Sequence, residues 1–175
     1  MNPILLTTAA LVLALTSVYS DTDIPIENPG FESGTDGWNI REKTPMSTAT
    51  ADAAHEGSQG LHVQDEDTVN GSSALSTVVP VEPGKTYTLT FWAKTNSVNT
   101  ASVSFWFFTD SRKLIGAGTQ NIPGLAITHT TGDWFEYTLT AVAPPEAVTL
   151  GIWIHSFSTA VGSVDFDDFK LTSGS

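Results

Sequence analysis

Cysteine is absent from the 175-residue sequence, and basic side chains are few. The missing thiols exclude disulfides, thiolate metal sites and a cysteine nucleophile. Seven lysines and arginines stand against 19 aspartates and glutamates, which gives a formal net charge of −12. This charge argues against nucleic acid and anionic membrane surfaces as partners, because both would repel the chain. A soluble extracellular protein, a cation binder and a binder of neutral ligands all remain compatible with it.

Long hydrophobic runs are missing except at the start of the chain. The apolar run ILLTTAALVLALTSVYS covers residues 4–20 and ends in small residues, as expected before a signal-peptidase site. The residues before it include no lysine or arginine, so an uncleaved membrane anchor is the alternative. We predict that residues 1–20 are a signal peptide and that residues 21–175 form one domain. The protein would then be secreted to the extracellular space, the periplasm or the cell surface, with no membrane attachment after cleavage.

Sustained helical periodicity is also missing after residue 20. Apolar residues instead alternate with polar ones, which is typical of half-buried strands. Turn sequences separate these segments, among them EPGK at 82–85 and APPE at 143–146. The sequence therefore predicts an all-β fold, a two-sheet antiparallel β-sandwich. The expected strands are 47–53, 60–65, 72–79, 86–94, 101–110, 134–143, 147–157 and 162–171.

Five motifs in a fixed order carry a family resemblance. They are NPGFESGTDGW (28–38), HEGSQGLHV (55–63), VEPGKTYTLTFWAKT (81–95), DWFEYTLTAVAPPEAVTLGIWI (133–154) and VDFDDFKL (164–171). Together they resemble the carbohydrate-binding modules of families 4 and 9, with families 16 and 22 nearby. The resemblance implies a galactose-binding-like jelly roll, often calcium-bound and often attached to secreted glycoside hydrolases. A separate glycoside hydrolase or a cell-surface assembly is therefore an expected protein partner.

Tryptophan occupies the outward side of three predicted strands. In each strand the alternating neighbours form the inward apolar set, so the indole points away from the core. These residues are Trp92, Trp106 and Trp153. Indole rings stack on the apolar C–H faces of sugars, and short polar side chains bind sugar hydroxyls. We predict one platform for a polysaccharide or oligosaccharide, with Phe108, Asp110, Lys94 and His155 at its margins.

Two other interpretations of these tryptophans remain open. A loop such as 111–132, or the second sheet, could cover them, since tryptophan is mostly buried in proteins. The same aromatic face could also contact another protein. The remaining tryptophans, Trp38 and Trp134, match family positions that are usually structural, so we expect both in the core.

The resemblance also implies one structural Ca²⁺ ion. Its ligands would be the Gly30 carbonyl, the carboxylates of Glu32 and Asp167, and backbone carbonyls of Glu56 and Gln59. Hard oxygen ligands of this mixture suit Ca²⁺. Alternation places Asp167 on the inward side with Phe169 and Leu171, where a carboxylate needs a cation. A solvated acidic edge of the sheet is the alternative.

Catalytic patterns are missing from the sequence. The four histidines show no metal-ligand spacing, and GSQG at 57–60 is not a nucleophile elbow. Asp167 and Asp168 are neighbours on one strand and would diverge, so they could not flank a glycosidic bond. We therefore predict a non-catalytic carbohydrate-binding protein. The alternatives are an extracellular protein-interaction or adhesion module and a small polysaccharide-active enzyme.

Overall fold

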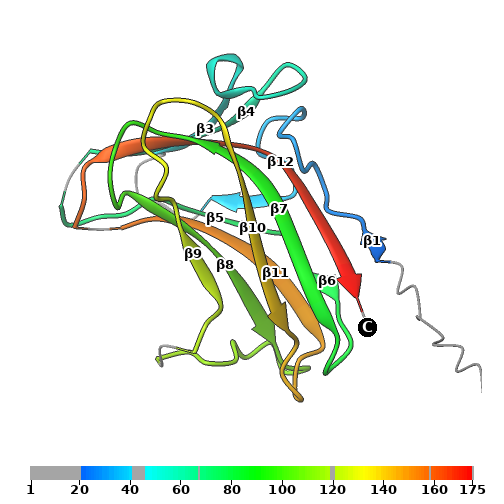
Figure 1. Ribbon diagram of the computed structural model, residues 1–175. Helices are drawn as coiled ribbons and strands as arrows, with labels where there is room; N and C mark the ends of the chain where they lie inside the picture. The colour runs from blue at the N-terminus through cyan, green and yellow to red at the C-terminus, as the bar shows by residue number, and fades with distance from the viewer. Residues whose placement is uncertain (1–20, 41–45, 67, 119–120, 158, 175) are drawn as a thin grey trace, which may run out of the picture.

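The computed structural model describes residues 21–40, 46–66, 68–118, 121–157 and 159–174 (Figure 1). The predicted signal peptide, residues 1–20, lies outside these ranges. Within them the chain forms twelve β-strands and one short 3-10 helix, η1 (Ala51–Ala53). The strands form two antiparallel sheets of six strands each, which confirms the predicted β-sandwich. Among the described residues no helix is long and apolar enough to cross a membrane.

The first sheet, called here the β7 sheet, runs in the order β10-β7-β12-β4-β3, and β1 also pairs with β12. Its strands are β1 (Thr22–Ile24), β3 (Ser47–Thr50), β4 (Gly60–Asp65), β7 (Thr86–Lys94), β10 (Phe135–Val142) and β12 (Gly162–Gly174). The first and last strands of the domain therefore lie side by side (Figure 1).

The second sheet, called the β8 sheet, runs in the order β2-β5-β11-β8-β9, and β6 also pairs with β11. Its strands are β2 (Trp38–Ile40), β5 (Ser73–Ser76), β6 (Val79–Pro80), β8 (Ala101–Phe108), β9 (Gly124–Ala126) and β11 (Thr149–Ser156). Strand β9 lies in a stretch predicted as loop, and β1 and β2 were not predicted. All three have only three residues, too few to show alternation.

The core lies between the two sheets and follows the predicted alternation. Leu89 and Phe91 of β7 and Phe105 and Phe107 of β8 are each at most 2% exposed. Trp38 is 5% exposed and packs on Phe31 and Phe169, which confirms its predicted place in the core. Because these side chains fill the interior, the intervening residues of each strand point to the two outer faces of the sandwich.

The division into sheets corrects the predicted platform of three tryptophans. Strand β7, which carries Trp92 and Lys94, belongs to one sheet, whereas Trp106 and Trp153 lie on adjacent strands of the other. Outward side chains of the two sheets point to opposite sides of the sandwich. Trp92 and Lys94 therefore cannot share a surface with Trp106 and Trp153. The sequence prediction failed here because alternation reveals a strand's outward side but not its sheet.

A β-bulge in β12 corrects the predicted orientation of Asp167. The register pairs Asp167 with Trp92 and then Lys170 with Thr90, so two residues of β12 oppose one residue of β7. Within the bulge, Asp168 has a positive φ of 53°. Asp167 therefore points to the same outer side as Trp92 and not to the inward side of Phe169. It is nonetheless fully buried, because residues 55 and 56 lie against it.

Candidate functional site

Five aromatic rings form a continuous row on the outer face of the β8 sheet. We call Phe108, Trp106, Trp153, His155 and Phe157 the aromatic strip. Ring centroids are 6.3 Å apart from Phe108 to Trp106 and 4.3 Å apart from Trp106 to Trp153. The row continues over 3.9 Å to His155 and 5.0 Å to Phe157. The strip joins two adjacent strands and extends beyond the end of β11.

Trp153 occupies the middle of the strip, between the tilted Trp106 ring and the stacked His155 ring. The β8–β11 register pairs Trp153 with Ser104, Trp106 with Gly151, and His155 with Ser102. Trp106 and His155 are therefore displaced from Trp153 in opposite directions along the strands. Their rings lie at interplanar angles of 35° and 15° to the Trp153 indole. His155 therefore covers one face of this indole, and Trp106 packs against it from the opposite direction along the strands.

His155 is held by a hydrogen bond at each ring nitrogen. Its Nδ1 lies 3.1 Å from the Ser156 carbonyl oxygen, which can only accept, so Nδ1 carries the proton. Its Nε2 lies 2.5 Å from the Ser102 hydroxyl. Burial lowers the pKa of His155 below its usual value, with a smaller opposing effect from the Ser156 carbonyl. The neutral imidazole therefore accepts a hydrogen bond from Ser102 and is fixed in one orientation.

The Trp106 indole nitrogen is buried, and it has no hydrogen-bond partner among the described residues. Buried donors are paired in the great majority of native structures, and an unpaired one costs about 1–3 kcal/mol. The outward position of Trp106 is therefore not explained by hydrogen bonding within this domain.

Two hollows lie at the ends of the strip. A groove of about 590 Å³ lies at the Phe108 end, and a hollow of about 300 Å³ lies at the Phe157 end. The groove is lined by Val78, Phe108, Thr109, Asp110, Arg112, Val148 and Thr149. The smaller hollow is lined by Gly71, Ser72, Ser73, Trp153, His155, Ser156 and Phe157. Both combine aromatic carbon with hydroxyl or charged groups, which is what a sugar ring requires from a protein.

The outer face of the β7 sheet carries aromatic residues in a different arrangement. The His55 ring stacks on Trp92 with centroids 4.1 Å apart and lies edge-on to Trp134 at 5.1 Å. The Lys94 ammonium lies 4.8 Å from the Trp134 ring centroid and 3.1 Å from Asp165. Trp134 is half-buried in this cluster, so its predicted place in the core is wrong. Trp92 is covered by the chain's own loop and serves to hold that loop.

Asp167 holds the same loop through hydrogen bonds to its backbone. One of its carboxylate oxygens accepts the backbone N–H groups of His55, at 2.7 Å, and Glu56, at 3.2 Å. The other accepts the N–H of Asp168 at 2.8 Å. Burial raises the pKa of Asp167, and these donors only partly oppose the rise. A buried carboxylate without a paired cationic side chain among the described residues is a natural position for a metal ion.

Glu32 binds the other end of this loop. Its carboxylate accepts the hydroxyl and the N–H of Ser58 and the N–H of Gln59. The Ser58 hydroxyl, followed by the two N–H groups, lowers the pKa of Glu32 below its usual value. Residues 55–59 therefore connect the N-terminal segment to the C-terminal strand. The N–H groups of Glu56 and Gln59, rather than the predicted carbonyls, face the two carboxylates.

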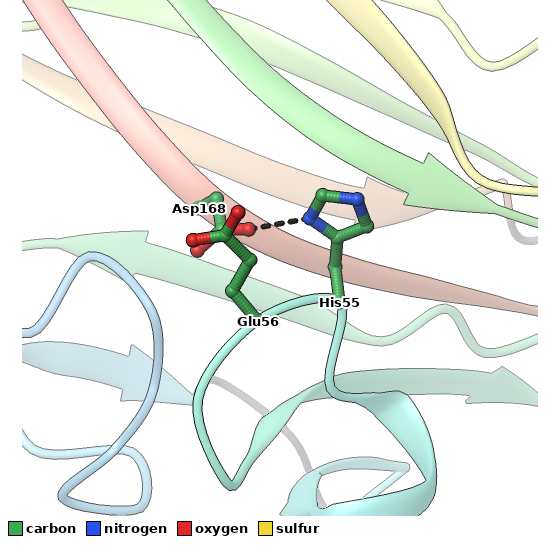
Figure 2. A group of neighbouring side chains, drawn as sticks. All are labelled: His55, Glu56 and Asp168. Carbon is green, nitrogen blue, oxygen red and sulfur yellow. Dashed lines mark hydrogen bonds and ion pairs between the residues drawn. The ribbon is translucent and has the colours of Figure 1, made fainter.

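A possible metal-binding group lies at the centre of this junction. Figure 2 shows the side chains of His55, Glu56 and Asp168 directed toward one another. One ligand atom from each lies within 4.8 Å of the others, and His55 Nδ1 is 2.6 Å from Asp168. A Cβ atom at Gly30 would lie 3.4 Å from an Asp167 oxygen, so the Gly30 backbone lies close to that carboxylate. The oxygen-rich set fits a hard cation.

Sequence reasoning identified some of these residues and missed others. Phe108, Trp106, Trp153, His155 and Asp110 are brought to one face, while Trp92 and Lys94 lie on the other. Arg112, Phe157 and the interaction of His55 with Asp168 were missed. Arg112 follows the end of β8 in a turn, and its position at the groove depends on a neighbouring strand. The sequence offers no signal for the His55–Asp168 contact, which joins residues 113 positions apart.

Comparisons with known proteins agree on the type of fold. The model of a family described as "Carbohydrate binding domain" matches residues 25–159. No curated protein matches the chain. The enzymatically active domain of tailspike protein 4 of bacteriophage CBA120 superposes with a TM-score of 0.68 at 18% identity, over 83% of this chain and 21% of that domain. A family 16 carbohydrate-binding module gives 0.61 at 18% identity, over 83% of this chain and 97% of the module.

A third similar structure contains a bound oligosaccharide. It is the CBM22-1 and GH10 portion of a xylanase from Clostridium thermocellum, complexed with xylohexaose. It gives a TM-score of 0.62 at 21% identity, over 87% of this chain and 28% of the xylanase. The chain thus spans about a fifth of the tailspike domain, a little over a quarter of the xylanase structure and nearly the whole of the isolated module.

Proposed function

The chain belongs to the carbohydrate-binding domain family of the 4 and 9 type, and on this premise we propose that it is a secreted, non-catalytic protein that holds a glycan chain on the outer face of the β8 sheet. The resemblance inferred from the five sequence motifs is confirmed by this family match. A carbohydrate-binding role follows from the family. The particular surface, the secretion and the lack of catalysis are the proposal.

The aromatic strip is the observation that supports the proposed surface. It places five rings in one row, with a hollow at each end that mixes apolar and polar groups. On the opposite face, the His55 ring stacks on Trp92, and the Lys94 ammonium lies over the Trp134 ring. The β8 sheet therefore presents the continuous row of rings that is bordered by hollows. The sugar rings would lie along the ring edges of the strip and enter the hollows at its ends.

The proposed ligand is a polysaccharide or oligosaccharide chain rather than a single sugar. The strip spans two strands and connects two separate hollows, so a ligand that uses both must have several sugar rings. The xylohexaose complex of a similar structure is consistent with a chain ligand. A separate glycoside hydrolase or a cell-surface assembly remains the proposed protein partner.

We also propose one structural Ca²⁺ ion at the junction of Gly30, Glu32, Asp167 and the loop 55–59. Asp167 and Asp168 would supply carboxylate oxygens, and Glu56 lies close enough to add another. The ion would neutralise the buried Asp167 charge and hold three distant segments of the chain together. It would lie at the β12 bulge in the β7 sheet, so its proposed role is to stabilise the domain and not to contact the glycan.

Glycan binding by tryptophan variants tests the proposed surface. The wild-type protein and the Trp106→Ala and Trp134→Ala variants would be applied to a glycan array, and hits measured by isothermal titration calorimetry. An indole contact of about 50–100 Å² contributes about 1–2.5 kcal/mol, so Trp106→Ala should weaken binding about 5- to 70-fold. Trp134→Ala removes a half-buried indole from the opposite face and is the matched control, with unchanged affinity expected.

Three results would contradict the proposed function. Wild-type protein that binds no glycan on the array would remove the carbohydrate ligand for this chain. Equal loss of affinity in both variants would show that the strip is not the binding surface. Release of reducing or unsaturated sugar ends from a bound glycan would show that the protein is an enzyme.

A further inference from the structure

The groove at the Phe108 end of the strip differs from the rest of the face because it contains charged side chains. Its walls include Val78 and Val148, which are 42% and 40% exposed. Asp110 and Arg112 line the same groove and come from the turn that follows β8. The groove therefore combines apolar carbon, one carboxylate and one guanidinium group within a space of about 590 Å³.

Arg112 adopts a backbone conformation that favours glycine. Its φ is +60°, in the left-handed region that side chains with a Cβ rarely occupy. The turn fixes this conformation, because the Arg112 N–H donates to the Thr109 carbonyl at 2.9 Å and the Thr109 N–H donates to the Lys113 carbonyl at 3.0 Å. Strained residues of this kind concentrate at functional sites, where the surrounding structure holds them in place.

Both charged groups of the groove are available to a ligand. In the part of the chain that the structure describes, the side chains of Asp110 and Arg112 form neither an ion pair nor a hydrogen bond. Three lysines of the chain, Lys85, Lys94 and Lys170, have carboxylate partners, whereas Arg112 and the adjacent Lys113 form no ion pair among the described residues. A guanidinium without an ion pair therefore lines the groove of about 590 Å³.

We propose that this groove is a subsite for one uncharged sugar ring of the glycan, read by Arg112 and Asp110 as a donor and acceptor pair. The proposal rests on the proposed function and specifies the substrate class at that surface. The guanidinium would donate two parallel hydrogen bonds to adjacent sugar hydroxyl oxygens. The Asp110 carboxylate would accept a hydrogen bond from a hydroxyl, and the C–H face would contact Phe108, Val78 or Val148.

The charge of the groove selects against an acidic sugar. Arg112 alone would suit the carboxylate of a uronic acid. Asp110 lies in the same groove, however, and the whole chain is strongly negative, so a polyanionic glycan would be repelled both locally and at long range. A neutral ring is repelled neither by Asp110 nor by the net charge of the chain, and its hydroxyls can hydrogen-bond to both Asp110 and Arg112. The neutral chain is therefore the expected ligand.

Titration calorimetry with paired ligands and variants of the turn tests this subsite. The ligands are a neutral hexasaccharide that the wild-type protein binds on the array and the hexauronate of the same linkage, with cellohexaose and a β-1,4-glucuronic acid hexamer as the first pair. We expect the uronate to bind at least tenfold more weakly. Arg112→Gly should lower affinity for the neutral chain about tenfold or more, because hydrogen bonds from a charged donor are lost.

Melting temperatures and two further variants, Arg112→Lys and Lys113→Ala, separate a loss of binding from a loss of folding. Arg112→Gly fits the positive φ, so its melting temperature should equal or exceed that of the wild type. Arg112→Lys keeps the charge but loses the planar fork, and should recover only part of the affinity. Lys113→Ala removes one positive charge at the next residue and should leave glycan affinity unchanged.

The outcomes separate this subsite from the function on which it rests. Wild-type binding that is sensitive to Trp106→Ala but unchanged in Arg112→Gly overturns the subsite and leaves the function intact. A hexauronate bound as tightly as the neutral chain overturns the uncharged substrate class. Failure of the wild-type protein to bind any glycan overturns the proposed function itself, and the subsite with it.

Discussion

The outer faces of the two sheets carry the same local sequence pattern in different surroundings. Strand β7 contains Phe91-Trp92 and strand β8 contains Phe105-Trp106, and in both the phenylalanine is fully buried while the tryptophan points outward. On the β7 sheet the loop 51–59 returns over Trp92 and stacks His55 on it. On the β8 sheet the rings of adjacent strands pack against one another, and hollows lie at both ends of the row.

The difference shows that an outward tryptophan has two distinct uses. One holds a segment of the same chain in place, and its loss should affect stability. The other presents aromatic surface to a ligand, and its loss should affect binding. The local sequence does not distinguish the two uses, because the covering loop comes from residues about 40 positions away. Each of the following experiments measures one face against the other.

The largest expected effect concerns Asp167 on the β7 side. Ca²⁺ at a hundredfold excess over its Kd would stabilise the native state by about 2.7 kcal/mol. Asp167→Ala should remove this gain. The variant should also lose about 3 kcal/mol of unfolding free energy in Ca²⁺, because three partly buried N–H groups lose their acceptor. Urea unfolding with Ca²⁺ and with EDTA measures both quantities. Asp133→Ala, which removes an exposed carboxylate, is the control.

Two results would contradict the calcium proposal. Identical unfolding curves of the wild type in Ca²⁺ and EDTA would remove the ion. A variant lacking Asp167 that still gained stability from Ca²⁺ would place the ion elsewhere.

A smaller effect is expected when the Trp92–His55 stack is removed. Trp92→Ala should lower the free energy of unfolding by about 2 kcal/mol, less than a fully buried tryptophan would cost. A double-mutant cycle with His55→Ala should give a coupling energy of about 0.5–1.5 kcal/mol, as for aromatic pairs. Glycan affinity should remain within about twofold of the wild type. A loss of affinity comparable to that of Trp106→Ala would mean that both faces bind the ligand.

The smallest expected effect is a pH dependence at His155 on the β8 side. Burial lowers its folded-state pKa below the unfolded value of about 6.5, so the fold favours the neutral ring. The stability that this provides is present above the unfolded pKa and is lost as the pH falls through the window down to the folded pKa. Replacement by phenylalanine should reduce the loss of unfolding free energy between neutral and mildly acidic pH.

Urea unfolding at several pH values would measure this difference, since the two proteins differ only at this side chain. An unchanged pH profile in His155→Phe would show that the ring is not held neutral in the fold. Glycan titration at the same pH values would show whether the strip weakens together with the fold.

Much of the fold could be predicted from the sequence because strand alternation is a local property. Leu89, Phe91, Phe105 and Phe107 are buried as their spacing predicts, and Trp106 is turned outward for the same reason. The candidate site was predicted only in part. Asp110 was expected at its margin, but Arg112 was not, because its place in the groove depends on Val78, Val148 and Thr149 from distant parts of the chain.

The sequence by itself determined that this is an all-β sandwich of a carbohydrate-binding family with tryptophans on the outer sides of its strands. Those properties depend on residue order and a two-residue period. Only the tertiary structure decided that Trp92 and Trp106 lie on opposite sides of the sandwich, because sheet membership depends on long-range pairing. It also decided the direction of Asp167, because one extra residue in the β12 bulge reverses the alternation that follows.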